Sequence, residues 1–206
     1  MSHLLVLNSS TNGPASASAS LVNELVQGHL ALDPATVVTE RDLDADPLPH
    51  LTGLTVNGVR AQAVTDKEIE ARELSDQLIA ELLAADTLVI GSPMHNFSVP
   101  TTLRAWFDHV LRPQVTFGYS AAGPKGLVEG KRAILVLARG GPYPEGPGIP
   151  QDHQESYLRD LLAFIGITDV EVVRAGRTAM GPDAREASIS AARNHIASLV
   201  GQRQAA

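Results

Sequence analysis

The chain of 206 residues has no cysteine. It can therefore form neither a disulfide nor an iron–sulfur cluster nor a cysteine-based zinc site, and nothing in its composition argues for an oxidising compartment. Basic residues are outnumbered, 16 against 23 acidic ones, which gives a formal net charge of −7. Because no basic patch stands out along the sequence, the phosphate backbone of a nucleic acid would be repelled, and we expect no nucleic-acid partner.

Long apolar runs are also lacking. The longest uncharged stretch, from Leu4 to Asn23, reaches the length of a membrane span, but it contains Gly13, Pro14 and six hydroxyl side chains, which a lipid-facing helix cannot satisfy. Its apolar part ends at Leu7, and no lysine or arginine precedes it, so it does not suit a signal peptide either. We expect a cytoplasmic protein without a membrane partner.

Short β-rich runs alternate with longer helical patterns, which is typical of a parallel sheet covered by helices on both faces. Five strands joined by right-handed crossovers predict an α/β fold, a three-layer sandwich with a five-stranded parallel sheet in the flavodoxin-like order 2-1-3-4-5. The length suits a single domain, residues 1–206. The expected strands are Leu4–Leu7, Thr36–Thr39, Thr87–Ile90, Ala133–Ala138 and Val170–Val173.

The connecting segments are of three kinds. Thr65 and Glu68 form a capping-box pattern at the start of a helix whose apolar residues continue to Leu83. The stretch 47–58, punctuated by proline and glycine, predicts a long surface excursion. The stretch 113–130 predicts an irregular segment, because a proline ends the preceding helix there.

Ligands of such sheets bind outside the carboxyl ends of the strands. The first loop at this edge follows Leu7 and is rich in hydroxyl side chains, which together with free N–H groups at a helix N-terminus form an anion site. No acidic residue occurs before Glu24, and the chain has neither a G-x-x-x-x-G-K-[ST] nor a G-x-G-x-x-G pattern, so a monophosphate fits best. The alternative is a flexible Ser/Ala-rich turn.

The second loop at this edge, from Gly91 to Pro100, contains Met94, His95, Asn96 and Phe97. A flat heteroaromatic ring needs an apolar face, polarisable contacts and amide groups at its edge, and this loop offers all of them. The alternative is that its methionine and phenylalanine belong to the core.

The third loop runs from Ala138 to Gly148 and contains two glycines in succession, Gly140 and Gly141, whose backbone amides can approach a ligand closely. Arg139 can place a positive charge near an electron-rich centre. A plain tight turn is the alternative.

These motifs together resemble the FMN-dependent NADH azoreductase family of flavodoxin-like NAD(P)H:quinone oxidoreductases and azoreductases. The resemblance covers essentially the whole chain, and its separated motifs follow the order and spacing of the family. One departure is His95, where the family usually has tyrosine, and another is Ala138, where a small hydroxyl residue is common. The matching segments are Ser16–Ser18, Pro93–Asp108, Thr116–Leu127, Ala138–Gly141 and Phe164–Val170.

The resemblance implies an FMN enzyme that takes hydride from NADH or NADPH and passes two electrons to a quinone or azo compound in a ping-pong cycle. The flavin would carry the chemistry, and no side chain stands out as an indispensable acid or base, although His95 is a possible participant. The implied FMN contacts are Ser10, Ser16, Ala17 and Ser18 at the phosphate, Met94, His95, Asn96 and Phe97 along the isoalloxazine ring, and Ala138, Arg139, Gly140 and Gly141 at its pyrimidine edge and reactive face.

The resemblance also implies a homodimer with its active sites at the interface. Phe117 and Tyr119 would then be shared walls of the substrate pocket. The helix face from Leu103 to Leu111, which includes Trp106 and Phe107, is richer in aromatic side chains than one face over a sheet usually needs, so we favour a contact between subunits over a role in the core.

Other functions fit the sequence less well. None of the seven histidines pairs with another at helical spacing, and no G-x-S-x-G elbow occurs, which argues against metal-dependent or triad hydrolysis, and we expect no metal site. A receiver-type signalling domain needs carboxylates at strand ends that here carry Asn8, Ser9 and Ser92. The strongest alternative is a flavodoxin-like electron carrier that binds the same flavin without a substrate of its own.

Overall fold

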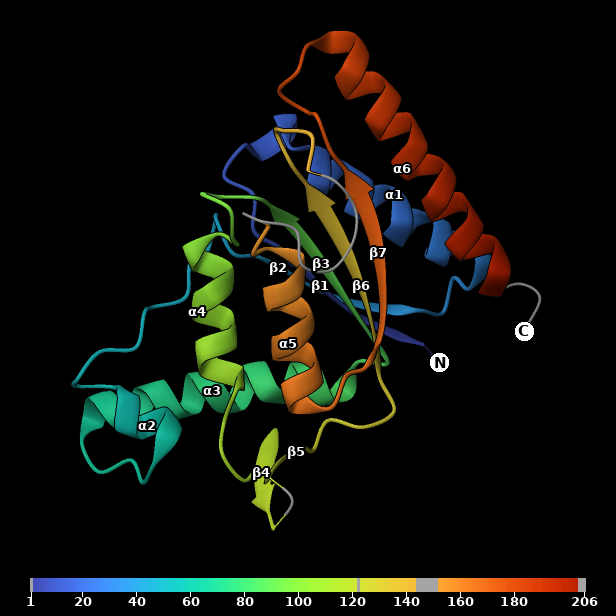
Figure 1. Ribbon diagram of the computed structural model, residues 1–206. Helices are drawn as coiled ribbons and strands as arrows, with labels where there is room; N and C mark the ends of the chain where they lie inside the picture. The colour runs from blue at the N-terminus through green and yellow to red at the C-terminus, as the bar shows by residue number, and fades with distance from the viewer. Residues whose placement is uncertain (1, 122, 144–151, 204–206) are drawn as a thin grey trace.

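A computed structural model describes residues 2–121, 123–143 and 152–203 of the chain (Figure 1). A five-stranded parallel sheet with the order β2-β1-β3-β6-β7 forms the centre of the molecule, which confirms the expected parallel sheet. Its strands are β1 (His3–Asn8), β2 (Val37–Asp42), β3 (Thr87–Pro93), β6 (Arg132–Ala138) and β7 (Asp169–Ala175).

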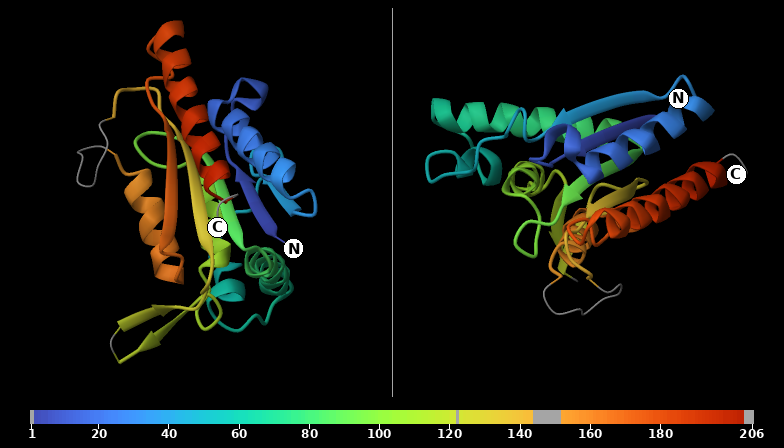
Figure 2. Two further views of the ribbon diagram at one scale, coloured as in Figure 1. Left: turned by 90° about the vertical axis from the view of Figure 1, so that its right-hand side faces the viewer. Right: turned by 90° about the horizontal axis from the view of Figure 1, so that it is seen from above.

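Helices cover both faces of the sheet (Figures 1 and 2). Because side chains alternate along a strand, Leu4 and Val6 of β1 pack against one layer, and Leu5 and Leu7 pack against the other. None of the helices in the described ranges combines the length and the apolar character that crossing a membrane requires. The first layer holds α1 (Ala17–Leu32) and α6 (Pro182–Arg203), and the second holds α3 (Asp66–Ala84), α4 (Thr101–Val110) and α5 (Glu155–Ile165).

The expected strand order 2-1-3-4-5 needs a correction. Two additional short strands, β4 (Phe117–Ser120) and β5 (Gly123–Gly126), form a separate antiparallel pair within the stretch expected to be irregular. This pair lies beyond the amino ends of the parallel strands (Figure 1), so the last two strands of the sheet become the sixth and seventh of the chain. The sequence G-P-K-G of β5 has no alternating apolar pattern, which is why it was not expected as a strand.

The aromatic face of α4 belongs to the core of a single chain. Trp106 and Phe107 are fully buried and meet edge to face with their ring centroids 5.0 Å apart. Leu103 and Val110 on the same face are also fully buried against the sheet. The expectation that this face contacts a second subunit is therefore wrong, because α4 packs over the sheet in one cluster with α3 and α5 and needs a wide apolar face.

The long excursion after β2 contains a short helix, α2 (Val56–Arg60), and is attached to the body of the molecule. The Arg72 side chain donates hydrogen bonds to the carbonyl groups of Gly58 and Ala61. A Cβ at Gly58 would lie 2.2 Å from the Glu68 carbonyl oxygen, so this close packing requires glycine. The His109 Nε2 atom lies 2.9 Å from the Pro49 carbonyl oxygen, and burial lowers the pKa of the His109 imidazole.

The capping box at the start of α3 is present as expected. The Thr65 hydroxyl accepts from the Glu68 N–H, and the Glu68 carboxylate accepts from the N–H groups of Thr65 and Val64 at 2.9 and 3.0 Å. These backbone hydrogen bonds lower the pKa of Glu68 to about 2, from an ordinary value of 4.5.

A glutamate whose pKa is lower in the folded than in the unfolded state stabilises the fold. This stabilisation is complete at a pH above the pKa of the unfolded state, and it is lost as the pH falls through the pKa of the folded state. We therefore expect the contribution of Glu68 to decline between about pH 4.5 and about pH 2. The variant Glu68→Gln should be less stable than the parent at pH 7, and the difference should disappear toward pH 2 in thermal unfolding followed by circular dichroism. A difference that does not change with pH would contradict this role of the carboxylate.

Candidate functional site

The three loops predicted to form the site meet at one cavity of about 340 Å³ at the carboxyl edge of the sheet. This follows from the parallel sheet, because the carboxyl ends of β1, β3 and β6 lie side by side at the same edge. The lining residues are Ser10, Asn12, Ala15, Ser16, Ala17, Ser18, Pro93, Met94, His95, Ala138, Gly140, Thr178, Ala179 and Arg185.

The serine loop places hydroxyl groups and a helix N-terminus at this cavity. Ser16 is the N-cap of α1, and its hydroxyl accepts from the Ala19 N–H at 3.1 Å and lies 3.2 Å from the Ser18 hydroxyl. The first N–H groups of a helix have no acceptor within the helix, so those of Ala17 and Ser18 remain available at the cavity. The described lining contains no carboxylate, and the first turn of α1 has no acidic residue. This end of the cavity therefore favours an anion.

The loop after β3 forms a tight turn beside the serine loop. The Met94 N–H donates to the Ala138 carbonyl at 2.7 Å, and His95 and Ser98 exchange two backbone hydrogen bonds of 2.9 Å. Asn96 and Phe97 take the left-handed conformation, with φ of 47° and 71°. Met94 and His95 line the cavity, whereas Asn96 and Phe97 lie at the tip of the turn.

The alternative that this loop fills the core is wrong. Phe97 is 46% exposed, and Met94 is only half-buried and lies outside the two hydrophobic clusters. A phenylalanine that is exposed and in the left-handed conformation is costly for folding alone, which agrees with a role of this turn in binding.

The loop after β6 contributes Ala138 and Gly140 to the lining. A Cβ at Gly140 would lie 3.3 Å from the Ala179 Cβ, whereas a Cβ at Gly141 would lie 3.3 Å from the Tyr143 ring. Of the two glycines, Gly140 lines the cavity and Gly141 follows it outside the lining. The residues 144–148 that were assigned to this loop lie outside the described residues.

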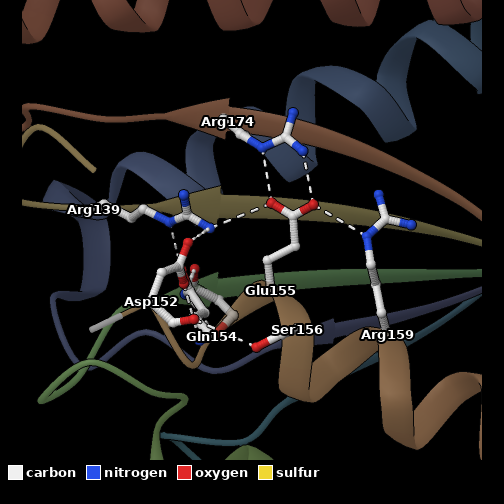
Figure 3. Close-up of polar contacts among 8 residues, drawn as sticks. Arg139, Asp152, Gln154, Glu155, Ser156, Arg159 and Arg174 are labelled. Carbon is white, nitrogen blue, oxygen red and sulfur yellow. Dashed lines mark hydrogen bonds and ion pairs between the residues drawn. The ribbon is translucent and has the colours of Figure 1, made fainter. Parts of the chain in front are cut away.

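The Arg139 side chain does not bring its charge to the cavity, contrary to expectation. It is 3% exposed and points into a cluster at the start of α5 (Figure 3). There its Nη2 lies 2.9 Å from an Asp152 carboxylate oxygen and 3.4 Å from a Glu155 oxygen, and its Nε donates to the Gln154 side chain at 3.1 Å. Its charge is neutralised where it lies, so Arg139 can reach a ligand only through its backbone.

The same cluster joins the two loops that line the cavity. The Gln154 side chain donates to the Ser92 carbonyl at 3.0 Å, just before the turn that contains Met94, and the His153 N–H donates to the Phe97 carbonyl at 2.9 Å. Glu155 also binds Arg174 at 2.7 Å and Arg159 at 3.1 Å. Burial alone would raise the pKa of Glu155, but these two guanidinium groups outweigh it and lower the pKa.

Phe117 and Tyr119 do not line the cavity of their own chain. They belong to the β4–β5 pair at the opposite end of the sheet (Figure 2). The Phe117 ring is buried with its centroid 4.5 Å from that of Phe164, whereas Tyr119 is 71% exposed.

A fourth segment completes the cavity and was not expected. Thr178 and Ala179 come from the connection between β7 and α6, and Arg185 comes from the first turn of α6. The Thr178 N–H and hydroxyl both donate to the Arg139 carbonyl at 3.0 Å. The parallel sheet could have predicted this segment, because the carboxyl end of β7 lies at the same edge as those of the other strands. The lining residues Asn12, Ala15 and Pro93 were also not singled out, although they lie in the predicted loops.

Comparison with known proteins agrees with the fold and the arrangement of loops. The family model of the flavodoxin-like fold matches residues 2–200. The chain is 53% identical to a protein of Hyphomonas neptunium named FMN-dependent NADH:quinone oxidoreductase, over 97% of this chain and 96% of that protein. It is 48% identical to a protein of Shewanella amazonensis with the same name, over 98% and 100% of the two chains.

A solved structure adds to these relatives. The crystal structure of an azoreductase from Bacillus anthracis superposes with a TM-score of 0.89 at 29% identity, over 98% of this chain and all of that one. The chain therefore belongs to the flavodoxin-like family, among the FMN-dependent NADH:quinone oxidoreductases and azoreductases that its motifs resemble.

Proposed function

We propose that this protein is an FMN-dependent enzyme that oxidises NADH or NADPH and reduces quinones and aromatic azo compounds. The observation that carries the proposal is the single cavity at which the predicted loops meet, with an anion site on one side and an edge of backbone groups and half-buried side chains on the other. The names of the relatives support the same activity. FMN, when bound, supplies the redox chemistry by accepting hydride and releasing two electrons.

The serine loop would hold the phosphate of FMN. Ser10, Ser16 and Ser18 offer hydroxyl donors, and Ala17 and Ser18 offer N–H groups at the positive end of the α1 dipole. Neutral donors and a helix N-terminus without nearby carboxylates suit a phosphate dianion.

The loops after β3 and β6 would hold the isoalloxazine ring. Met94 and His95 would lie along the ring, with Asn96 and Phe97 at the tip of the same turn. Ala138, Gly140 and Gly141, together with the backbone of Arg139, would contact the pyrimidine edge. The buried cluster of Arg139, Asp152 and Gln154 would keep both loops in place while the ring is bound.

His95 is the clearest departure from the family pattern, and we expect its side chain not to take part in the chemistry. Its backbone is fixed by two hydrogen bonds to Ser98, so contacts made by this backbone do not depend on the side chain. The variant His95→Tyr should keep FMN and most activity, and its rate between roughly pH 5.5 and 8 should vary with pH as that of the parent does. An ionisation seen in the parent and missing in the tyrosine variant would make His95 a participant in catalysis.

We also propose that the protein works as a homodimer in which the β4–β5 pair of one subunit reaches the site of the other. Tyr119 is an exposed aromatic residue on a pair of strands that extends from the body of the molecule, and Phe117 anchors this pair on Phe164. Exposed aromatic side chains of this kind are typical of interfaces.

The variant Tyr119→Ala should weaken the dimer by about 2 kcal/mol, a usual value for an interface tyrosine, and should lower turnover without unfolding the chain. Sedimentation over a dilution series would measure the association, and Val64→Ala, a change at another exposed apolar residue, is the matched control. Association and turnover equal to those of the parent would remove this surface from the proposed dimer.

The rate of NADH oxidation tests the proposed function against the alternative of an electron carrier. An enzyme with catalytic FMN should consume a large excess of NADH when a quinone is supplied, whereas a carrier without its own substrate should stop after about one equivalent per flavin.

We propose that the whole chain, residues 1–206, acts as one FMN-binding domain. Its location in the cytoplasm stays a prediction from the sequence.

A further inference from the structure

Arg185 brings a positive charge to the serine side of the cavity. It lies in the first turn of α6, is half-buried, and its Nη2 donates a hydrogen bond of 3.3 Å to the Ala15 carbonyl, directly before the N-cap of α1. It lines the same cavity as Ser10, Ser16 and Ser18. Two helices that are far apart in sequence thus present their first turns to one anion site.

The charge of Arg185 is not neutralised within the described ranges 2–121, 123–143 and 152–203. No carboxylate lies within ion-pair distance of it there, and none lines the cavity. Asp183 in the same helical turn is outside the lining, and Glu186 lies 3.7 Å from Arg193. Among the described residues, its guanidinium makes one hydrogen bond, to the Ala15 carbonyl, which leaves most of its donors for a ligand.

The position of Arg185 is fixed by the packing of α6 on α1. Ile196 and Leu199 of α6 belong to the same buried cluster as Leu21 and Leu25 of α1. The Arg193 guanidinium donates to both carboxylate oxygens of Glu24 at 3.0 Å, which joins the same two helices. The guanidinium is therefore presented to the serine loop by a helix that the core holds in place.

We infer that Arg185 binds the phosphate of FMN beside the α1 N-terminus and makes the site selective for the phosphorylated flavin over riboflavin. The inference rests on the proposed function. The serine hydroxyls and the N–H groups carry only partial charge, whereas a guanidinium adds a full charge and parallel N–H donors that match phosphate oxygens. Riboflavin has the same ring and no phosphate, so Arg185 contributes nothing to its binding.

Titration of flavin fluorescence with the parent and three variants tests this inference. Arg185→Gln should weaken FMN binding by about 10-fold or more, the effect of losing one charge-assisted hydrogen bond, and should change riboflavin binding by less than about 2-fold. Arg185→Lys should keep part of the preference for FMN, because it retains the charge. Arg193→Gln is the matched control, since it removes the same charge from the same helix outside the cavity. It should not change the preference, because its ion pair with Glu24 is exposed and the apolar packing of α6 on α1 remains.

The outcomes separate this inference from the proposed function. If the parent binds FMN and Arg185→Gln keeps the full preference for FMN over riboflavin, or loses affinity for both flavins equally, the inference is overturned and the FMN site stands. If the parent binds neither flavin, both the proposed function and the inference about Arg185 are overturned. Circular dichroism of Arg185→Gln checks that the variant folds, and a loss of preference in Arg193→Gln equal to that in Arg185→Gln also overturns a specific contact.

Discussion

Replacing Ser18 with aspartate is expected to weaken FMN binding by about 100-fold, which corresponds to about 3 kcal/mol. The Ser18 side chain is buried at the N-terminus of α1 and lies beside the Ser16 hydroxyl. A carboxylate there would face the phosphate dianion at short range, and a hydroxyl donor would be lost. Fluorescence titration of FMN gives the affinity directly.

Two further variants separate the charge from other effects. Ser18→Asn has nearly the size of aspartate and no charge, so it should lose much less affinity. Ser20→Asp places the same carboxylate on the exposed side of the first turns of α1, outside the cavity, where an acidic residue suits the helix dipole. If Ser18→Asp binds FMN as tightly as Ser20→Asp does, the serine loop is not the phosphate site.

Removing the Asp152 carboxylate is expected to destabilise the protein by about 3 kcal/mol, the lower end of the cost of breaking a buried ion pair. The Arg139 side chain is 3% exposed and that of Asp152 8% exposed. Among the described residues, Asp152→Ala leaves the buried guanidinium with the more distant Glu155 carboxylate oxygen at 3.4 Å and the neutral Gln154 oxygen at 3.1 Å. Arg139 directly precedes Gly140 in the loop after β6, and its partner Gln154 contacts Ser92 at the start of the loop after β3. We therefore expect both ring-binding loops to shift and the affinity for FMN to fall as well.

Urea unfolding measures this loss, and Asp169→Ala is its matched control. Asp169 is 65% exposed and lies 3.8 Å from Arg132, so its removal should cost less than about 1 kcal/mol. The double variant Arg139→Met with Asp152→Leu should be more stable than Asp152→Ala, because it removes both charges. Unfolding of Asp152→Ala at the same urea concentration as the parent would show that the cluster does not support the loops.

The sequence was sufficient for the parallel sheet and for the place of the site. Apolar runs and helical periodicity identify the five strands, and the parallel arrangement then requires the loops after Leu7, Ile90 and Ala138 to meet. The Thr65–Glu68 capping box was also predictable, because it is formed by residues close in sequence.

The direction of the Arg139 side chain was missed although a signal existed. Ala133, Leu135 and Leu137 of β6 face the layer that contains α5, whereas Ile134 and Val136 face α1 and α6. Continuing this alternation places Arg139 on the side of α5, away from the helix layer that carries the serine loop. Its partners Asp152 and Glu155 lie on a distant segment, so the sequence alone does not identify them.

Other features depend on tertiary packing that local patterns do not reveal. The burial of Trp106 on α4 depends on the packing of this helix with α3, α5 and the sheet. The β4–β5 pair is held by the contact of Phe117 with Phe164, which is remote in sequence. The approach of Arg185 to Ala15 joins residues at the two ends of the chain.

The most direct test of the account is anaerobic reduction of the protein reconstituted with FMN and freed of unbound flavin. The account predicts that the protein retains the visible absorption bands of FMN, that NADH or NADPH bleaches these bands, and that a quinone added afterwards restores them without release of flavin. A protein that takes up no FMN, or whose bound FMN is reduced by neither nucleotide, would contradict the account.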